Sequence, residues 1–134
     1  MSQANSQQPM NTATLLERYA AGKRDFRRAE LGDADLQGVN LKGADFSYAD
    51  LSEAKLKGAN FRGSDLSYAD LSYADLTDAD LRGTMLIAAN LRQANLQGAN
   101  LEGADYDPST HFPSNFDPIK AGMQTKQSEA EQSQ

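Results

Sequence analysis

Large hydrophobic residues recur at every fifth position of the chain, as Leu or Phe from Phe26 to Leu101, with Tyr106 as a variant last member. A small residue, usually Ala, lies two positions before nearly every one of them, and Asp or Asn lies directly before. On an α-helix, five residues advance the side chain by about 140°, which would scatter the leucines around the cylinder. On a flat strand, an odd spacing would alternate them between the two faces. Neither element would have one buried face.

A chain that turns a corner every five residues would instead direct one large residue of each short side toward a common axis. The small residue two positions earlier shares that inward face in extended geometry. The pattern therefore predicts an all-β solenoid, in which each side buries one large and one small residue and the sides stack along one axis.

The number of sides follows from residues that recur two positions after the large one. Glycines there are more often twenty than fifteen residues apart, and Tyr48 and Tyr68 are also twenty apart. Four sides are therefore favoured. The repeat then makes about four coils, which at ~4.8 Å each form a rod about 20 Å long.

The segments ADLSY, ADLTD, ANLRQ, ANLQG and ANLEG resemble the A(D/N)LXX pattern of the pentapeptide-repeat family. The resemblance covers residues 24–108 and implies a right-handed quadrilateral β-helix of a small, cyanobacterial-type member. The hand comes from the resemblance alone. The pattern departs at five positions, none of which changes the register: Val39, Ser64, Thr84, Lys55 and Met85.

The two ends of the chain differ from the repeat. We expect residues 1–11 and 124–134, which are polar and rich in Gln and Ser, to be disordered tails. Within the segment 12–23, Thr14-Leu15-Leu16-Glu17 has the form of a capping box and Gly22 suits a helix stop, which predicts a helix at about 14–21. It would cover the open end of the first coil. The alternative is a docking helix for another protein.

After Asp107, three prolines disfavour another β coil, so residues 109–123 are expected to form an irregular C-terminal cap. The alternative is a dimer interface, because longer family members dimerise end to end. With both ends capped we expect a monomer.

The composition of the chain excludes or disfavours several classes of function. The net charge of −6 disfavours nucleic acid as a partner, and the lack of cysteine excludes disulfides and thiolate chemistry. The chain starts without the apolar stretch of a signal peptide and has no run of transmembrane length, so we expect a cytoplasmic protein without a membrane partner. His111 is the single histidine, and the filled interior leaves no cavity. We therefore expect no enzyme, metal or cofactor.

Twenty-residue coils place residues twenty apart in outward columns. One column is acidic and includes Asp25, Asp45 and Asp65, which as paired carboxylates would suit acid–base catalysis or a cation. The alternative is that Asp and Asn are a requirement of the repeat, bonding to the local backbone at each corner. The second interpretation is favoured, because the same residue types occur on every side.

Two other surfaces are candidate binding sites. A candidate basic face carries Lys42, Arg62 and Arg82 beside a column made only of glycine, and it would suit an acidic partner. Its alternative is that glycine relieves a corner with positive φ, while the cations offset neighbouring acids. Exposed aromatic and aliphatic residues mark interaction sites. The candidate partner-binding residues are Tyr48, Tyr68, Tyr73, Met85 and Ile87.

For Met85 and Ile87 the alternative is that Phe112 or Phe116 folds back over them. The sequence thus favours a non-catalytic protein–protein interaction module or scaffold with an unidentified protein partner. The alternative is a DNA-mimic inhibitor of a type II topoisomerase (gyrase), because some family members bind these enzymes. A 20 Å rod spans only ~6 base pairs of duplex, however, and the basic face interrupts a negative surface.

Overall fold

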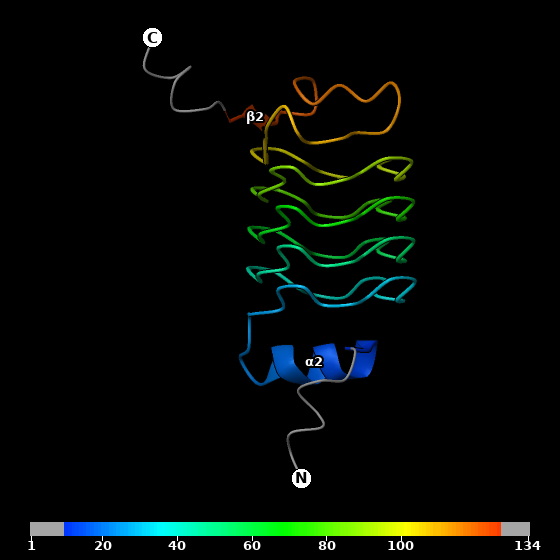
Figure 1. Cartoon of the computed structure of the whole chain (residues 1–134), viewed down its shortest axis with the longest axis vertical. Coiled ribbons are helices and arrows are strands. Elements are labelled where there is room, and N and C mark those ends of the chain that lie inside the picture. The colour runs from blue at the N-terminus through cyan, green and yellow to red at the C-terminus, as the bar shows by residue number, and fades with distance from the viewer. Residues whose placement is uncertain (1–9, 127–134) are drawn as a thin grey trace.

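The computed structural model describes residues 10–126. Its coils stack along one axis, with helix α2 (Thr12–Ala20) at one end and the short strands β1 (Asp105–Tyr106) and β2 (Gln124–Thr125) at the other (Figure 1). Residues 1–9 and 127–134 of the two predicted tails lie outside the described residues.

Every pentapeptide ends in a tight turn. The N–H of the small residue usually donates to the C=O of the large residue three positions earlier, as from Ala49 to Phe46 at 3.0 Å. The Ala44 N–H instead donates to the Ser64 hydroxyl oxygen at 3.2 Å. The third residue of each such turn has a positive φ, whether it is Gly63 (φ 70°) or Tyr48 (φ 63°). Positive φ at this position is a feature of type II turns, and it brings the chain round a corner every five residues.

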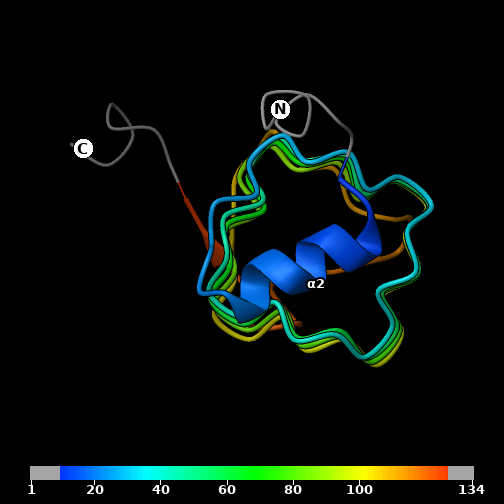
Figure 2. The same cartoon turned by 90° about the horizontal axis from the view of Figure 1, so that it is seen from below.

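Between corners, adjacent coils are joined through single residues in parallel bridges. From Asp25↔Asp45 to Met85↔Asp105 the bridged residues are always twenty apart. This spacing confirms four sides per coil, and the coils superpose when viewed along the axis (Figure 2). Because each side contributes so few bridged residues, the described chain contains only the two-residue strands β1 and β2, which pair in parallel.

The core is the column of inward side chains. Phe26 and Phe46 stack with ring centroids 5.3 Å apart, and Phe61 meets Phe46 edge to face at 5.6 Å. The leucines from Leu31 to Leu91 that point inward are buried, and each contributes roughly 2 kcal/mol gross to stability. Ser64 is tolerated in a small inward position, because its buried hydroxyl donates to the Leu41 carbonyl at 2.9 Å.

Helix α2 begins earlier than predicted. Asn11 is its N-cap, and the Asn11 Oδ1 accepts a hydrogen bond from the Thr14 N–H at 2.8 Å. The predicted capping box at Thr14 is therefore wrong. At the other end, Gly22 takes a φ of 93° and the Lys23 N–H bonds back to the Arg18 carbonyl at 2.9 Å, so the predicted glycine stop is confirmed.

This helix lies across the open end of the first coil (Figure 2). Leu15 is fully buried in the core. The Tyr19 hydroxyl donates to the Lys42 carbonyl at 2.7 Å, and the Thr12 hydroxyl approaches the Asp35 carbonyl at 3.4 Å. Both carbonyls face the end where no further coil supplies N–H donors, so α2 satisfies edge groups as well as covering leucines.

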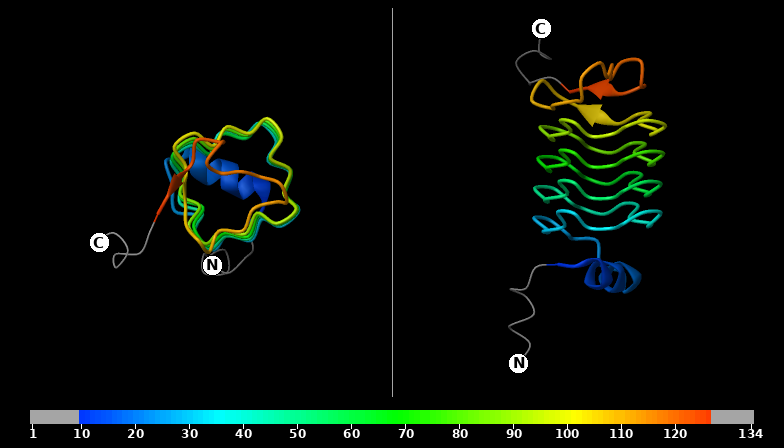
Figure 3. Two further views of the ribbon diagram at one scale, coloured as in Figure 1. Left: turned by 90° about the horizontal axis from the view of Figure 1, so that it is seen from above. Right: turned by 90° about the vertical axis from the view of Figure 1, so that its right-hand side faces the viewer.

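The C-terminal segment makes one irregular circuit over the last coil (Figure 3). It touches the ladder at His111, whose carbonyl accepts from the Leu91 N–H at 2.7 Å, and again where β2 pairs with β1. Gln124 and Thr125 were predicted in a disordered tail, and that prediction is wrong. The Gln124 N–H donates a hydrogen bond to the Ala104 carbonyl at 2.7 Å. The composition of the C-terminal segment does not indicate this contact, because its partner lies twenty residues away.

Candidate functional site: two corner columns

The Asp and Asn residues before the large hydrophobic residues serve the corners. The Asn60 Oδ1 accepts from the Arg62 N–H at 2.9 Å, and the Asp75 Oδ1 accepts from the Thr77 N–H at 3.0 Å. The hydroxyl and N–H of Thr77 hold the pKa of Asp75 below its usual value. The same bond recurs around the solenoid, which confirms the interpretation of these residues as a requirement of the repeat.

Within residues 10–126, no group of three or more His, Cys, Asp or Glu side chains is arranged to hold a metal ion. Among the helices of that part of the chain, none combines the length and apolar character needed to cross a membrane.

The candidate basic face carries less free charge than its sequence indicates. Arg82 forms a two-point ion pair with Asp80, with Nη2–Oδ2 at 2.6 Å and Nε–Oδ1 at 2.9 Å. This contact lowers the pKa of Asp80 and raises that of Arg82. Lys42 and Arg62 have no ion pair within residues 10–126.

The glycine column beside these cations has φ values between 65° and 73°, and a Cβ atom at any of its members would meet open space. This edge of the solenoid is therefore flat. We call it the glycine column; its members are Gly43, Gly63, Gly83 and Gly103.

The next corner carries aromatic side chains on the same backbone. The rings of Tyr48 and Tyr68 stack with centroids 4.7 Å apart and planes 3° from parallel, and both residues are about half exposed. Below them, the Arg28 guanidinium lies 4.7 Å from the Tyr48 ring centroid. The next residue upward is Ala88. We call these four residues, Arg28, Tyr48, Tyr68 and Ala88, the tyrosine column.

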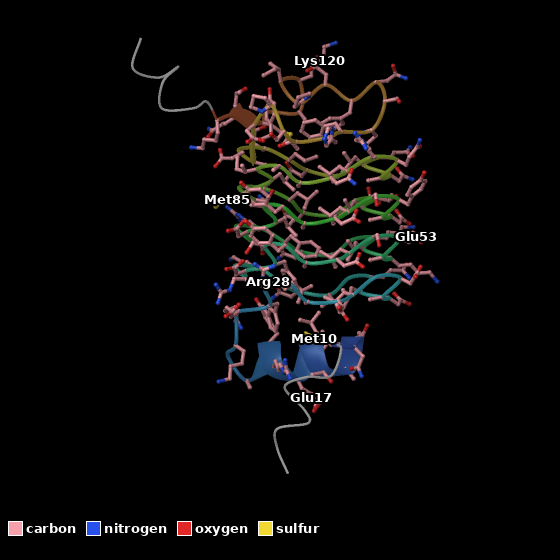
Figure 4. All side chains as sticks on the ribbon, in the orientation of Figure 1. Met10, Glu17, Arg28, Glu53, Met85 and Lys120 are labelled. Carbon is pink, nitrogen blue, oxygen red and sulfur yellow. The ribbon has the colours of Figure 1, made fainter. Side chains whose placement is uncertain are left out.

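Met85 and Ile87 lie on the coil above Tyr68. The Tyr68 N–H donates to the Ile87 carbonyl at 2.8 Å, and Met85 is 43% exposed. Figure 4 shows Met85 on the same side of the solenoid as Arg28, with Glu53 toward the opposite side. Tyr48, Tyr68, Met85 and Ile87, which we call the tyrosine patch, therefore gather on one side.

The fold-back of Phe112 or Phe116 predicted as an alternative does not cover Met85, which is exposed, while Ile87 is half-buried. Instead, the Phe112 ring packs against the rings of Tyr106 and Phe116, with centroid distances of 5.5 Å and 5.1 Å. Both phenylalanines are used to cover the end of the last coil, and Met85 stays exposed.

Tyr73 is separate from the tyrosine patch. It lies on the following corner, in the column of Glu53 and Gln93, and is 63% exposed. There it lines an open groove of about 550 Å³, to which Phe112 and Pro113 also contribute. The five candidate residues thus divide into a group of four and one at a different corner.

Sequence reasoning missed two members of the site. Arg28 lies twenty residues before Tyr48, so the column rule could have found it. Asp107 could not be found in this way: its Oδ1 accepts from the Ala88 N–H at 3.0 Å only because the chain leaves the regular coil at that point.

Comparison with known proteins identifies the repeat. The sequence model described as Pentapeptide repeats matches in eight copies, over residues 25–63, 44–83 and 64–103. No curated protein matches the chain.

Three of the solved structures that are similar to it show the relationship. A pentapeptide repeat protein from Nostoc (alr5209) is 69% identical, with a TM-score of 0.87, and the match covers 90% of this chain and 100% of that one. A thylakoid-lumen protein from Arabidopsis thaliana is 37% identical, with a TM-score of 0.52 and coverage of 63% and 61%. Rfr23 from Cyanothece is 32% identical, with a TM-score of 0.51 and coverage of 66% and 63%. These relatives imply that the four-sided coils wind as a right-handed quadrilateral β-helix. The chain belongs to the pentapeptide repeat family.

Proposed function

We propose that the protein is a non-catalytic interaction module that presents the tyrosine patch to a partner protein. The observation that carries this proposal is the pair of stacked, half-exposed rings of Tyr48 and Tyr68 beside the exposed Met85. Tyrosine and methionine are enriched in protein–protein interfaces, and tyrosine is enriched among residues that dominate binding energy.

Tyr48 and Tyr68 lie at a backbone position whose positive φ suits glycine best. Tyr48 and Tyr68 both adopt a φ of 63°, a left-handed conformation that disfavours a residue with a Cβ by roughly 1 kcal/mol or more. Glycine fills the same position throughout the glycine column and avoids this cost. Residues with a Cβ such as Glu53 and Gln93 accept the same conformation at other corners, so φ alone does not mark a binding site. The size, exposure and stacking of the two tyrosine rings favour binding over folding as their role.

The backbone ladder fixes the positions from which the two rings project, and their stacking orders the rings before a partner binds. The Tyr48 N–H donates to the Ser67 carbonyl at 3.0 Å, and Tyr68 is tied to Ile87 in the same way. Rings fixed on a rigid scaffold lose little conformational entropy on binding, which favours affinity.

The DNA-mimic alternative has less support. Such a mimic needs a continuous negative surface, whereas Lys42 and Arg62 present cations without ion pairs in the described part of the chain. A gyrase supercoiling assay separates the two functions: the proposal expects no inhibition at micromolar protein.

The proposal is tested by affinity capture from an extract of the source organism. The variant is Tyr48→Asn with Tyr68→Asn, because asparagine tolerates positive φ better than most residues with a Cβ. The matched control is Tyr73→Asn, which removes an exposed tyrosine from an equivalent corner. We expect the double variant to lose a partner that the wild type and the control retain. Retention of every partner by the double variant would contradict the proposal.

A further inference from the structure

In the tyrosine column, both faces of the Tyr48 ring are covered by neighbouring side chains, whereas the Tyr68 ring is covered on one face. Tyr48 is covered on one face by the Arg28 guanidinium and on the other by the Tyr68 ring. Tyr68 has a ring only on its lower side, because Ala88 occupies the next place in the column and its side chain ends at Cβ. No side chain of the tyrosine column therefore covers the upper face of the Tyr68 ring, and Tyr68 is 52% exposed.

A carboxylate adjoins this open place. The Asp107 Oδ1 accepts from the N–H groups of Ala88 and Ser109, both at 3.0 Å, and contacts the Thr110 hydroxyl at 3.1 Å. These bonds fix the carboxylate beside Ala88 and use only one of its oxygens. Asp107 forms no ion pair within residues 10–126, so its Oδ2 can accept from an incoming donor.

We propose that an arginine side chain of the partner protein occupies this place, stacked on Tyr68 and hydrogen-bonded to Asp107. The inference rests on the proposed function and names the chemistry of the partner: a basic, arginine-bearing segment.

Two observations and one chemical property select arginine. Arg28 already shows a guanidinium against a ring of the same column. A planar guanidinium can stack on an aromatic face and donate to a carboxylate in its own plane, which the compact lysine ammonium cannot do. The protein also has a net charge of −6, which complements a basic segment.

The direct test is an NMR titration of the wild-type protein with the peptide acetyl-Gly-Arg-Gly-amide. Two comparison peptides carry lysine or the neutral isostere citrulline in place of arginine. We expect saturable shifts of the Tyr68, Ala88 and Asp107 signals with the arginine peptide, weaker binding of the lysine peptide and no saturation with citrulline. Equal shifts with arginine and lysine, spread over the acidic columns, would overturn the inference.

Three variants locate the binding. Tyr68→Asn removes the ring, and we expect binding of the arginine peptide to weaken about tenfold, as for loss of a partly desolvated cation–π contact. Asp107→Asn keeps the oxygen that bonds the Ala88 N–H and removes the charge, with a similar expected loss. Ala88→Arg should place a guanidinium on Tyr68 from within the chain and abolish saturable binding.

Tyr73→Asn is the control and should bind as the wild type does. If Ala88→Arg retains wild-type affinity while its spectrum shows a folded protein, the inference is overturned. A shift of the Tyr68 signals that grows with protein concentration alone would assign the place to a second copy of the chain, which also overturns it.

The inference and the proposed function fail separately. If capture depends on Tyr48 and Tyr68 but not on Asp107→Asn or Ala88→Arg, the interaction module stands and the arginine is wrong. If capture does not depend on the tyrosines at all, the proposed function is wrong, whatever the peptide shows.

Discussion

The glycine column and the tyrosine column lie on adjacent corners with the same backbone conformation, but their surfaces differ in character. Gly63 has a φ of 70° and Tyr68 a φ of 63°, and each donates its N–H to the coil above. One corner is flat and flanked by cations, while the other carries stacked rings. The turn thus accepts side chains of very different size, so the choice of side chain is a property of the surface and not of the fold.

The largest expected effect comes from removing core that the two columns share. Phe46 contacts both Phe26 and Phe61, so Phe46→Ala leaves a cavity between neighbouring sides. We expect the free energy of unfolding to fall by about 3–5 kcal/mol, measured by urea denaturation. Tyr73→Asn, at an exposed position, serves as the control. A loss below about 1 kcal/mol would show that the stacked rings do not support the coils.

Exchanging the corners tests the comparison itself. Gly63→Ala adds a Cβ in open space, so its cost arises from the positive φ alone. We expect a loss of about 1–2 kcal/mol in the free energy of unfolding. Tyr68→Gly relieves the same strain but loses the stack with Tyr48, and should change stability by less than about 1 kcal/mol. Equal losses in the two variants would refute the view that the tyrosines are retained for binding.

The hydrogen bond from the backbone N–H to the Asn or Asp side chain should contribute equally to the free energy of unfolding in both columns. Asn60→Ala removes the acceptor for the Arg62 N–H in the repeat that carries Gly63, and Asp65→Ala removes the acceptor for the Ser67 N–H in the repeat that carries Tyr68. Each should lower the free energy of unfolding by about 1 kcal/mol. Thermal melts of the two variants at neutral pH provide the measurement, and a large inequality would show that the columns differ in their folding role.

The smallest effect concerns acid. The pKa values of Asp75 and Asp80 are lowered in the folded protein, mainly by the Thr77 hydroxyl and the Arg82 guanidinium respectively. Their contribution to stability is complete above the unfolded pKa of about 3.9 and is lost as the pH falls through the lower folded values. We expect the melting temperature to decrease when the pH is lowered below about 4. Asp75→Asn keeps the corner acceptor and should flatten this part of the profile; an unchanged profile would contradict the assignment.

The sequence predicts the repeat well because every coil obeys one local rule. The fivefold spacing sets the buried residues, and the twenty-residue recurrence of Tyr48 and Tyr68 sets the number of sides. The same rule places Arg28 under Tyr48, where its guanidinium lies 4.7 Å from the ring centroid.

The ends were harder to predict because they depend on contacts between distant residues. Asn11 and Thr14 are both good N-cap residues, and the contacts of Thr12 and Tyr19 with the first coil favour the longer helix. Likewise, the prolines of the C-terminal segment argue against a strand there, although Gln124 pairs with Asp105 of the last coil. Asp107 reaches Ala88 only because the chain departs from the repeat there.

The bridges between residues twenty apart also limit how such a chain can change length. Inserting one pentapeptide between Tyr48 and Tyr68 would turn everything after it by one side, and the two rings would then project from different corners. Only an insertion of a whole coil would lengthen the stack and keep it straight. In a solenoid of this kind a binding surface can therefore grow or shrink only in steps of four repeats, although the fold itself would accept single ones.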